Sequence, residues 1–231
     1  MVNRPRSGQG YFVWKPYSSP PASLPWPKSA TPPAIRSVLN LGSRSKVPTT
    51  RLGSPSKMKR DTVIVIHLLG SHGPAYSQRS PAAYKRFLPE CTSVNLQDCS
   101  RETLLNAYDN SIAYTDHLLA STIGWLKGQS AAWDTAMVYV ADHGESLGEN
   151  NLYLHGLPYA LAPDVQKHVP WITWLSPAYE RRSGITTACL QSARDTRISH
   201  DHYFHSVVGL LGVQVGAYRP GLDVYARCAG A

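Results

Sequence analysis

The sequence predicts an α/β sandwich that has a mostly parallel sheet and is incomplete. Two apolar runs, residues 62–69 and 135–141, are continuous and rich in Val or other strand-forming residues, as in strands buried on both faces. A helical pattern lies between them, and polar loops with histidine or aspartate follow both runs. This order is typical of α/β domains with ligands beyond the strand ends. The elements are too few for a whole domain, so apolar strand edges are expected to lack partners.

A long helix is predicted over residues 100–126. Ser100 is a suitable N-cap, and Glu102 favours the first turn. Apolar residues recur at helical spacing, which indicates core packing. They are Leu104, Leu105, Tyr108, Ile112, Leu119, Ile123 and Leu126.

Two further elements are predicted nearer the carboxyl terminus. Residues 171–175 follow Pro170 and are predicted to form a strand. A closing helix is expected to run from a Ser199 cap through Leu211, with Asp201 near its positive end.

Composition divides the chain near residue 60. Residues 1–60 hold 11 Lys plus Arg, 10 Pro, 10 Ser and no acidic residue, whereas residues 61–231 hold 12 basic and 15 acidic residues. The net charge of +8 therefore comes from the leader. We expect the leader to be disordered, because it cannot bury enough apolar surface to offset the entropy of ordering. Contact with nucleic acid or anionic lipid through its basic residues is the alternative.

Membrane and export signals are not evident in the sequence. A transmembrane helix needs roughly 18 or more apolar residues in succession, and no such run occurs. The residues after Arg4 and Arg6 lack the apolar core of a signal peptide.

The chain has four cysteines, all after residue 60. Cys91 and Cys99 are too far apart for a Cys-x-x-Cys metal or redox motif, so a disulfide fits better than two thiols in a loop. Closing so short a loop contributes about 2.5 kcal/mol in the chain-entropy model and implies an oxidising compartment. The sequence leaves open whether Cys189 and Cys228 pair.

The most informative stretch places Asp142 and His143 directly after the predicted strand at residues 135–141. Adjacent carboxylate and imidazole groups reach one ion when the backbone turns, and Gly144 permits such a turn. This donor pair suits zinc, with manganese second. The alternative is that Asp142 caps a helix and His143 is an ordinary surface histidine.

The motif residues around this pair resemble the phosphoethanolamine transferases that modify lipid A, which include the colistin-resistance enzymes, within the sulfatase and alkaline phosphatase superfamily. The resemblance extends over residues 61–231. It rests on Asp142-His-Gly-Glu-Ser-Leu-Gly-Glu149, Tyr153-Leu-His-Gly156, the Gly70-Ser-His-Gly-Pro74 loop, Asn106–Asn110 and Ala162–Trp171. It implies that residues 61–231 are the carboxyl-terminal part of an enzyme domain with a sulfatase-like α/β/α sandwich.

The resemblance also assigns roles to individual residues. It implies that Asp142 and His143 bind zinc and that His72, Glu145 and His155 line a phosphoethanolamine pocket. His72 as a loop histidine, His155 as a backbone cap and Glu145 as a first-turn helix acid are the alternatives. The resemblance also favours the Cys91–Cys99 disulfide.

Other histidines are not assigned to the site. His67 is expected to support its loop or pack at the strand end. His200, His202 and His205 do not converge on one helical face, so we do not expect them to bind one metal ion together.

Partners and location follow from the same resemblance. It implies phosphatidylethanolamine as donor, a lipid A phosphate as acceptor and the periplasmic face of the bacterial inner membrane, with membrane association through a domain that this sequence lacks. No nucleic acid partner is expected.

One departure from the family pattern concerns catalysis. The family uses a threonine nucleophile and a further acidic zinc ligand upstream of the matched segment. Residues 1–60 have no acidic residue, and Thr49-Thr50 lacks Thr-Gly-Thr surroundings. Two ligands seldom hold zinc tightly when about four donors are usual. We therefore assign no catalytic residue and expect these 231 residues to be inactive.

Other functions stay open on the sequence. Within enzymes, a phosphoglycerol transferase or a sulfatase-like hydrolase is the second choice, and Glu145 is the discriminating residue, because a carboxylate suits a cationic head group. A noncatalytic basic binding protein, acting through residues 1–60, is an alternative of another class.

Overall fold

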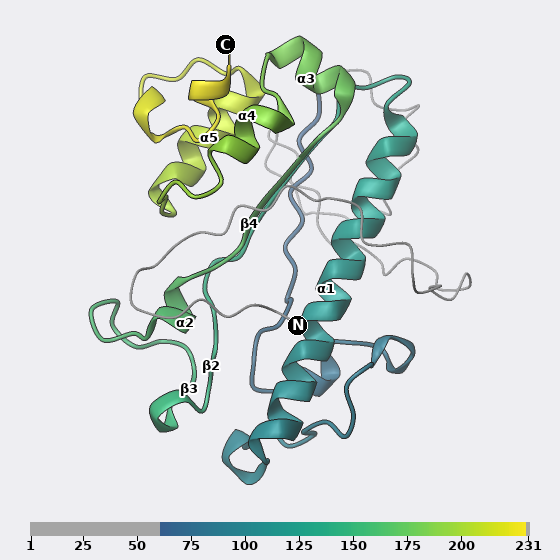
Figure 1. Cartoon of the computed structure of the whole chain (residues 1–231), viewed down its shortest axis with the longest axis vertical. Helices are drawn as coiled ribbons and strands as arrows, with labels where there is room; N and C mark the ends of the chain where they lie inside the picture. The colour runs from purple at the N-terminus through teal and green to yellow at the C-terminus, as the bar shows by residue number, and fades with distance from the viewer. Residues whose placement is uncertain (1–60, 230–231) are drawn as a thin grey trace, which may run out of the picture. The chain divides into compact units, whose positions relative to one another are not determined.

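The computed structural model describes residues 61–229, which fall into two compact units, residues 61–122 and 123–229. The predicted disordered leader at residues 1–60 lies outside the described residues. Figure 1 shows the elements in chain order. None of the helices between residues 61 and 229 combines the length and apolar character that crossing a bilayer requires.

The amino-terminal unit, residues 61–122, is mostly loop and helix. Three short 3-10 helices, η2 (Tyr76–Gln78), η3 (Ala82–Tyr84) and η4 (Leu96–Asp98), precede α1 (Arg101–Gln129). The Ser100 hydroxyl accepts a hydrogen bond from the Thr103 amide at 3.2 Å, which confirms the predicted cap. The disulfide between Cys91 and Cys99 is also confirmed and closes the loop before α1.

The buried stripe of α1 is more polar than its apolar pattern suggested. Leu104, Leu119 and Ile123 are buried as expected, but Ile112 is 46% exposed and Asn110 is fully buried. The Asn110 side chain accepts from the amides of Arg86 and Phe87 and donates to the Phe87 carbonyl, at 2.7–3.0 Å. A buried amide satisfied in this way fixes the preceding loop to the helix.

The strand predicted at residues 62–69 is not formed. These residues have no regular secondary structure, and Val65 and Leu69 are 42% and 56% exposed. A strand of a parallel sheet depends on hydrogen-bonded neighbours on both sides. Within residues 61–229, strand pairing joins only β1 with β4 and β2 with β3. The apolar run therefore lacks the ladder that its composition suits.

The carboxyl-terminal unit, residues 123–229, is built on an antiparallel strand pair. β1 (Ala136–Val140) pairs with β4 (Trp171–Leu175), with Val140 opposite Trp171 at one end and Ala136 opposite Leu175 at the other. Both strands were predicted at nearly these bounds. The described ladders are antiparallel, so the mostly parallel sheet does not appear among residues 61–229.

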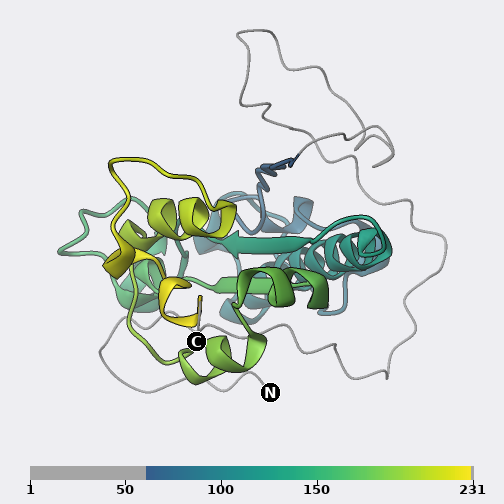
Figure 2. The ribbon, with the colours of Figure 1, turned by 90° about the horizontal axis from the view of Figure 1, so that it is seen from above.

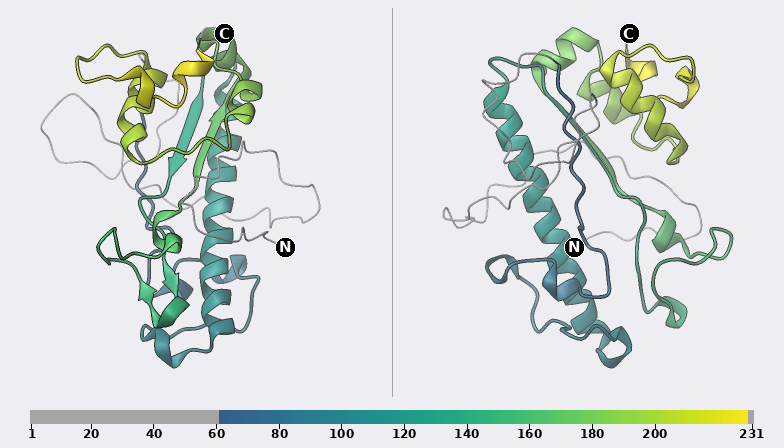
Figure 3. Two further views of the ribbon diagram at one scale, coloured as in Figure 1. Left: turned by 60° about the vertical axis from the view of Figure 1, so that its left-hand side comes forward. Right: turned by 180° about the vertical axis from the view of Figure 1, so that it is seen from behind.

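The chain between β1 and β4 forms a long excursion. It contains β2 (Ser146–Leu147), η5 (Glu149–Asn151), β3 (Tyr153–Leu154) and α2 (Asp164–Lys167). Figure 3 shows this excursion beyond one end of the strand pair. That end is where β1 finishes and β4 starts.

The remaining helices pack around the strand pair, as Figure 2 shows. They are α3 (Pro177–Ser183), α4 (Thr187–Ser192), α5 (Asp201–Leu211), η6 (Pro220–Leu222) and η7 (Ala226–Cys228). The second disulfide, which the sequence left open, joins Cys189 of α4 to the fully buried Cys228. The predicted closing helix is confirmed as α5, although it begins after Ser199 and His200.

The core of this unit centres on Trp171, which is 0% exposed. Leu175, Tyr179 and Tyr225 are buried in the same cluster. The Tyr225 hydroxyl accepts from the Trp171 indole nitrogen at 3.2 Å and lies 2.7 Å from the Thr173 hydroxyl. Burial raises the pKa of Tyr225, so this phenol stays neutral and available for both bonds.

Tyr225→Phe is expected to destabilise the carboxyl-terminal unit by about 1–3 kcal/mol. The change leaves the buried Trp171 N–H without its acceptor while keeping the ring volume. Chemical denaturation measures the loss. Tyr203→Phe is the control, because Tyr203 is 45% exposed. Equal stability of Tyr225→Phe and the parent chain would contradict the expected role of the hydroxyl.

Candidate active site

Asp142 and His143 follow the end of β1, as predicted. Ala141 extends the ladder by one bond, donating its amide to the Pro170 carbonyl at 3.3 Å. The chain then turns, and the Asp142 carboxylate accepts a hydrogen bond from the His143 amide at 3.0 Å. The Asp142 side chain is 85% exposed. The strand end thus presents a carboxylate and an imidazole side by side.

Gly144 is required at this turn for space rather than for an unusual backbone conformation. Gly144 is not among the glycines of positive φ. A Cβ atom built on it would lie 2.0 Å from the carbonyl oxygen of Val165. Its amide donates to the Gln166 carbonyl at 2.9 Å. The backbone of α2 therefore packs directly against the turn, where no side chain fits.

The ring of His143 is oriented by a backbone bond. Its Nδ1 lies 3.1 Å from the Gly144 carbonyl oxygen. Because a carbonyl only accepts, this contact places the hydrogen on Nδ1. Nε2 is then the nitrogen with a lone pair to offer a metal, the usual arrangement for histidine ligands.

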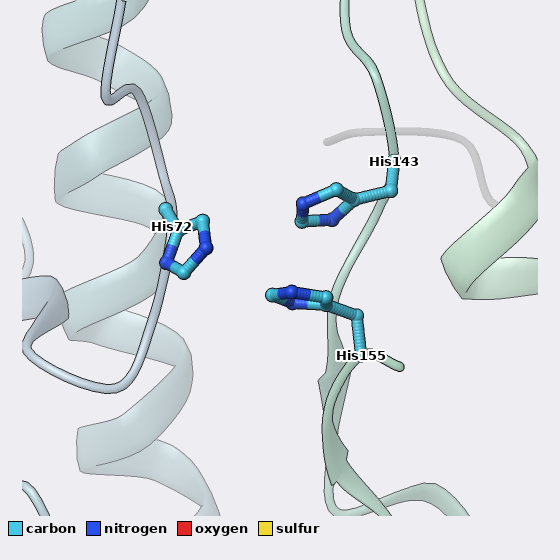
Figure 4. A group of neighbouring side chains, drawn as sticks. All are labelled: His72, His143 and His155. Carbon is cyan, nitrogen blue, oxygen red and sulfur yellow. The ribbon is translucent and has the colours of Figure 1, made fainter. Parts of the chain in front are cut away.

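His155 lies against His143 and contacts Glu145. The two imidazole rings have centroids 3.8 Å apart and planes inclined by 31°, and Figure 4 shows them one over the other. Nδ1 of His155 lies 3.2 Å from Oε2 of Glu145, whose side chain is only 4% exposed. Glu145 precedes β2 and is not in a helix, so its alternative role as a first-turn acid is wrong.

The backbone around His155 explains how the ring reaches this position. Leu154 and Gly156 have φ values of 64° and 108°. Two left-handed residues turn the chain sharply on either side of the histidine, and such a conformation is uncommon for leucine. The turn follows β3, which pairs with β2 next to Glu145.

Asp142 and His143 fit a zinc ion. Nε2 of His143 and Oδ2 of Asp142 lie 3.9 Å apart. Two ligands of one tetrahedral zinc, each at roughly 2.0–2.1 Å, lie ~3.3 Å from each other. A rotation of the exposed Asp142 carboxylate would bring the two ligand atoms to this separation. The pair supplies half of the roughly four donors that zinc usually takes.

His72 belongs to the amino-terminal unit. Its side chain is exposed, and its Nδ1 lies 2.7 Å from the Gly73 carbonyl oxygen. The Arg79 guanidinium donates to its backbone carbonyl at 2.7 Å, which holds the loop in shape. Figure 4 also draws this ring. Its assignment to the head-group pocket remains a prediction.

The other histidines have separate contacts. His67 is exposed. Nδ1 of His202 accepts from the Ser199 amide at 3.1 Å, and Nδ1 of His205 accepts from the Arg219 amide at 3.0 Å. His200 bonds elsewhere, to the Ala141 carbonyl. His200, which precedes α5, and the two histidines of α5 therefore contact different backbone groups, in line with their exclusion as one metal cluster.

Gln166 is a residue that sequence reasoning missed. It is 6% exposed, and its side chain donates to the buried Ser146 hydroxyl at 2.8 Å, while its carbonyl accepts from Gly144. It therefore joins α2 to both the Asp-His turn and β2. A single glutamine in a four-residue helix carries no sequence signal for this role.

Two side chains next to these segments have shifted pKa values. Burial, and secondarily the Asp142 carboxylate, raises the pKa of Tyr139. Burial lowers the pKa of His168, against a smaller opposing effect of Asp164. Both groups are therefore neutral at neutral pH.

The family model of the sulfatases, described as "Sulfatase", matches residues 52–213. The chain belongs to the sulfatase family. Two curated relatives are phosphoethanolamine transferase EptA of Salmonella typhimurium, 46% identical over 74% of this chain, and Kdo(2)-lipid A phosphoethanolamine 7''-transferase of Escherichia coli, 34% identical over 65%. The matched regions cover 31% and 26% of those proteins, so the chain spans under a third of their length.

Two solved structures of phosphoethanolamine transferase domains are similar to this chain in sequence and fold. The soluble domain of lipooligosaccharide phosphoethanolamine transferase A from Neisseria meningitidis is 39% identical with a TM-score of 0.73, over 76% of this chain and 53% of that one. The carboxyl-terminal periplasmic domain of EptC from Campylobacter jejuni is 39% identical with a TM-score of 0.61, over 68% and 48%. The predicted family and the sulfatase-like α/β fold class are therefore confirmed, apart from the parallel strand pairing.

Proposed function

We propose that this chain forms the zinc-binding and head-group-binding part of a phosphoethanolamine transferase that modifies lipid A. The observation that carries the proposal is the arrangement after β1. Asp142 and His143 form a metal-ligand pair, and His155 stacks on His143 while contacting the buried Glu145 carboxylate. A pair of metal ligands beside an imidazole that contacts a buried carboxylate is suited to binding an anionic phosphate ester.

Each side chain has a defined task in this proposal. Asp142 and Nε2 of His143 would hold zinc, which neutralises charge on a transferring phosphoryl group and activates a hydroxyl. His155, whose Nδ1 lies 3.2 Å from the Glu145 carboxylate, would donate a hydrogen bond to a phosphate oxygen from its other ring nitrogen. His72 and Glu145 are proposed as further pocket residues, with Glu145 facing the ammonium group.

The proposed substrates are phosphatidylethanolamine as donor and a lipid A phosphate as acceptor. The lipid A modifying relative and the lipooligosaccharide transferase structure support this acceptor class. The proposed location is the periplasmic face of the bacterial inner membrane, which the periplasmic EptC domain supports.

The expected result for the metal site is weak zinc binding by the 231-residue chain, which His143→Ala abolishes. Removing one of two ligands leaves too few donors for zinc. Titration with zinc in competition with a weak chromophoric chelator measures the affinity. His117→Ala is the control, because His117 lies in α1, packs on Tyr84 and takes no part in the Asp-His turn. Equal loss in both variants, or none in His143→Ala, would count against the site.

Head-group selectivity distinguishes the proposed function from the two alternative enzyme functions. Titration with soluble phosphoethanolamine, glycerol phosphate and sulfate is expected to favour phosphoethanolamine. Glu145→Gln is expected to weaken phosphoethanolamine binding roughly 10- to 100-fold, since a charge-assisted bond contributes roughly 1.5–3 kcal/mol. Preference for glycerol phosphate would favour a phosphoglycerol transferase, and preference for sulfate would favour a sulfatase-like hydrolase.

These 231 residues are not expected to turn over substrate. No threonine matched to the family nucleophile is present, and without a nucleophile the two-step route is lost. The assay is release of diacylglycerol from labelled phosphatidylethanolamine. Turnover that His143→Ala abolishes would show that another residue completes the site. Steeply salt-dependent binding of DNA by residues 1–60 would instead favour the noncatalytic basic protein.

A further inference from the structure

One side chain far along the sequence contacts the backbone that carries the proposed metal ligands. Nε2 of His200, in the residue that precedes α5, lies 2.9 Å from the carbonyl oxygen of Ala141. A carbonyl oxygen only accepts, so Nε2 carries the hydrogen and donates it. The two residues are 59 positions apart in the chain. The contact therefore ties the start of α5 to the end of β1.

The bonded carbonyl is the one that matters for Asp142. The peptide between Ala141 and Asp142 is planar, so a bond to its oxygen also fixes the direction of the Asp142 amide and Cα. The amide of Ala141 is already held by the Pro170 carbonyl at 3.3 Å. Both backbone polar groups of Ala141, the last residue before the metal-ligand pair, are therefore hydrogen-bonded, the amide to Pro170 and the carbonyl to His200.

The far side of the turn is held as well. The Gly144 amide donates to Gln166 at 2.9 Å, and the Asp142 carboxylate accepts from the His143 amide. Asp142 has an 85% exposed side chain, so side-chain packing does little to aim it. Its direction depends on the backbone, and hence on the bonds at Ala141 and Gly144.

We propose that His200 is a positioning residue that fixes the Asp142–His143 turn for metal binding. This rests on the proposed function, because it takes Asp142 and His143 as the zinc ligands. His200 acts through the Ala141 carbonyl and does not itself touch the metal. Partners of this kind in metal sites change affinity by about 10- to 100-fold when removed.

The neighbouring His202 provides a matched comparison. It lies at the same helix start, but its Nδ1 accepts from the Ser199 amide and not from the turn. A purely structural role of the α5 start would make His200→Ala and His202→Ala equivalent. A positioning role makes only His200→Ala affect the turn.

The first experiment measures zinc affinity of the 231-residue chain by competition with a chromophoric chelator, and the absorption spectrum of bound Co²⁺. His200→Ala is expected to weaken zinc at least 10-fold and to alter the Co²⁺ spectrum. His200→Gln is expected to recover most of the affinity, since its amide donates to the same carbonyl. His202→Ala is expected to keep the parent affinity. Parent-like zinc binding by His200→Ala, failed rescue by His200→Gln, or equal weakening by His202→Ala would each overturn the proposal.

A second measurement does not depend on metal. Hydrogen exchange of metal-free chain, followed on peptides covering residues 139–147, is expected to be faster in His200→Ala and parent-like in His200→Gln. Unchanged exchange in His200→Ala overturns the proposal. If the parent chain takes up no zinc, the proposed zinc function fails, and the exchange result alone decides whether His200 holds the turn.

Discussion

Gly144→Ala is expected to destroy the Asp-His turn and with it zinc binding. The added methyl carbon would lie 2.0 Å from the Val165 carbonyl oxygen, and 3.1 Å from its carbonyl carbon. Both are backbone atoms, so no side-chain rotation relieves the overlap. The turn and α2 must separate, which breaks the bond from Gly144 to Gln166. Overpacking of this kind costs about 1–3 kcal/mol or more.

The measurements are the zinc affinity and the free energy of unfolding of the same purified chain. Gly124→Ala is the matched control, because a Cβ there meets no atom within 4 Å and the residue lies inside α1. It is expected to stabilise the chain by roughly 0.5–1 kcal/mol. Zinc binding by Gly144→Ala at the parent level would show that α2 moves freely and that the close approach has no functional weight.

Removing the Cys189–Cys228 disulfide is expected to be the most destabilising change away from the site. The bridge closes a sequence separation of 39, for which the chain-entropy model gives about 4 kcal/mol. Cys228 is fully buried in the cluster around Trp171, so Cys189→Ala with Cys228→Ala avoids placing a hydroxyl there. The expected result is a large fall in the unfolding free energy of the carboxyl-terminal unit.

The comparison variant removes the other bridge. Cys91→Ala with Cys99→Ala opens a separation of 8, which the same model values at about 2.5 kcal/mol. Urea unfolding, monitored by tryptophan fluorescence and hydrogen exchange, separates the two units. A smaller effect from the 39-residue bridge than from the 8-residue bridge would contradict the entropic explanation.

The sequence predicted the elements whose partners lie within the described residues. The strand at residues 171–175 appears as predicted because β1 pairs with it, and the Ser100 cap of α1 appears because a capping serine acts on the adjacent helical turn. The run at residues 62–69 failed for the opposite reason. Its composition favours burial in a sheet, but a strand forms only where neighbouring strands pair with it, and composition does not show whether they do.

The site divides in the same way. Asp142 and His143 were predicted as metal ligands because they are adjacent, follow a strand and lie in a motif that resembles the family's, and that assignment stays a prediction. The hydrogen bonds that fix the backbone of that turn were not predictable, because their partners, the His200 ring and the Gln166 carbonyl, are remote in sequence. The contact between Glu145 and His155 depends on the left-handed conformation of Leu154, which no residue preference indicates.

The pairing of Val140 with Trp171 has a consequence for how this site tolerates change in length. The pair closes the base of the excursion from residue 141 to residue 170, and Asp142 and His143 lie beside that base. The entropic cost of a longer loop grows only logarithmically, by about 0.6 kcal/mol for each doubling. Insertions in the exposed stretch at residues 156–161 are therefore expected to leave the strand register and the proposed metal-ligand pair in place. Under the proposed function, the length of the loop beside His155 is thus a variable that can change the head-group preference without moving the proposed metal ligands.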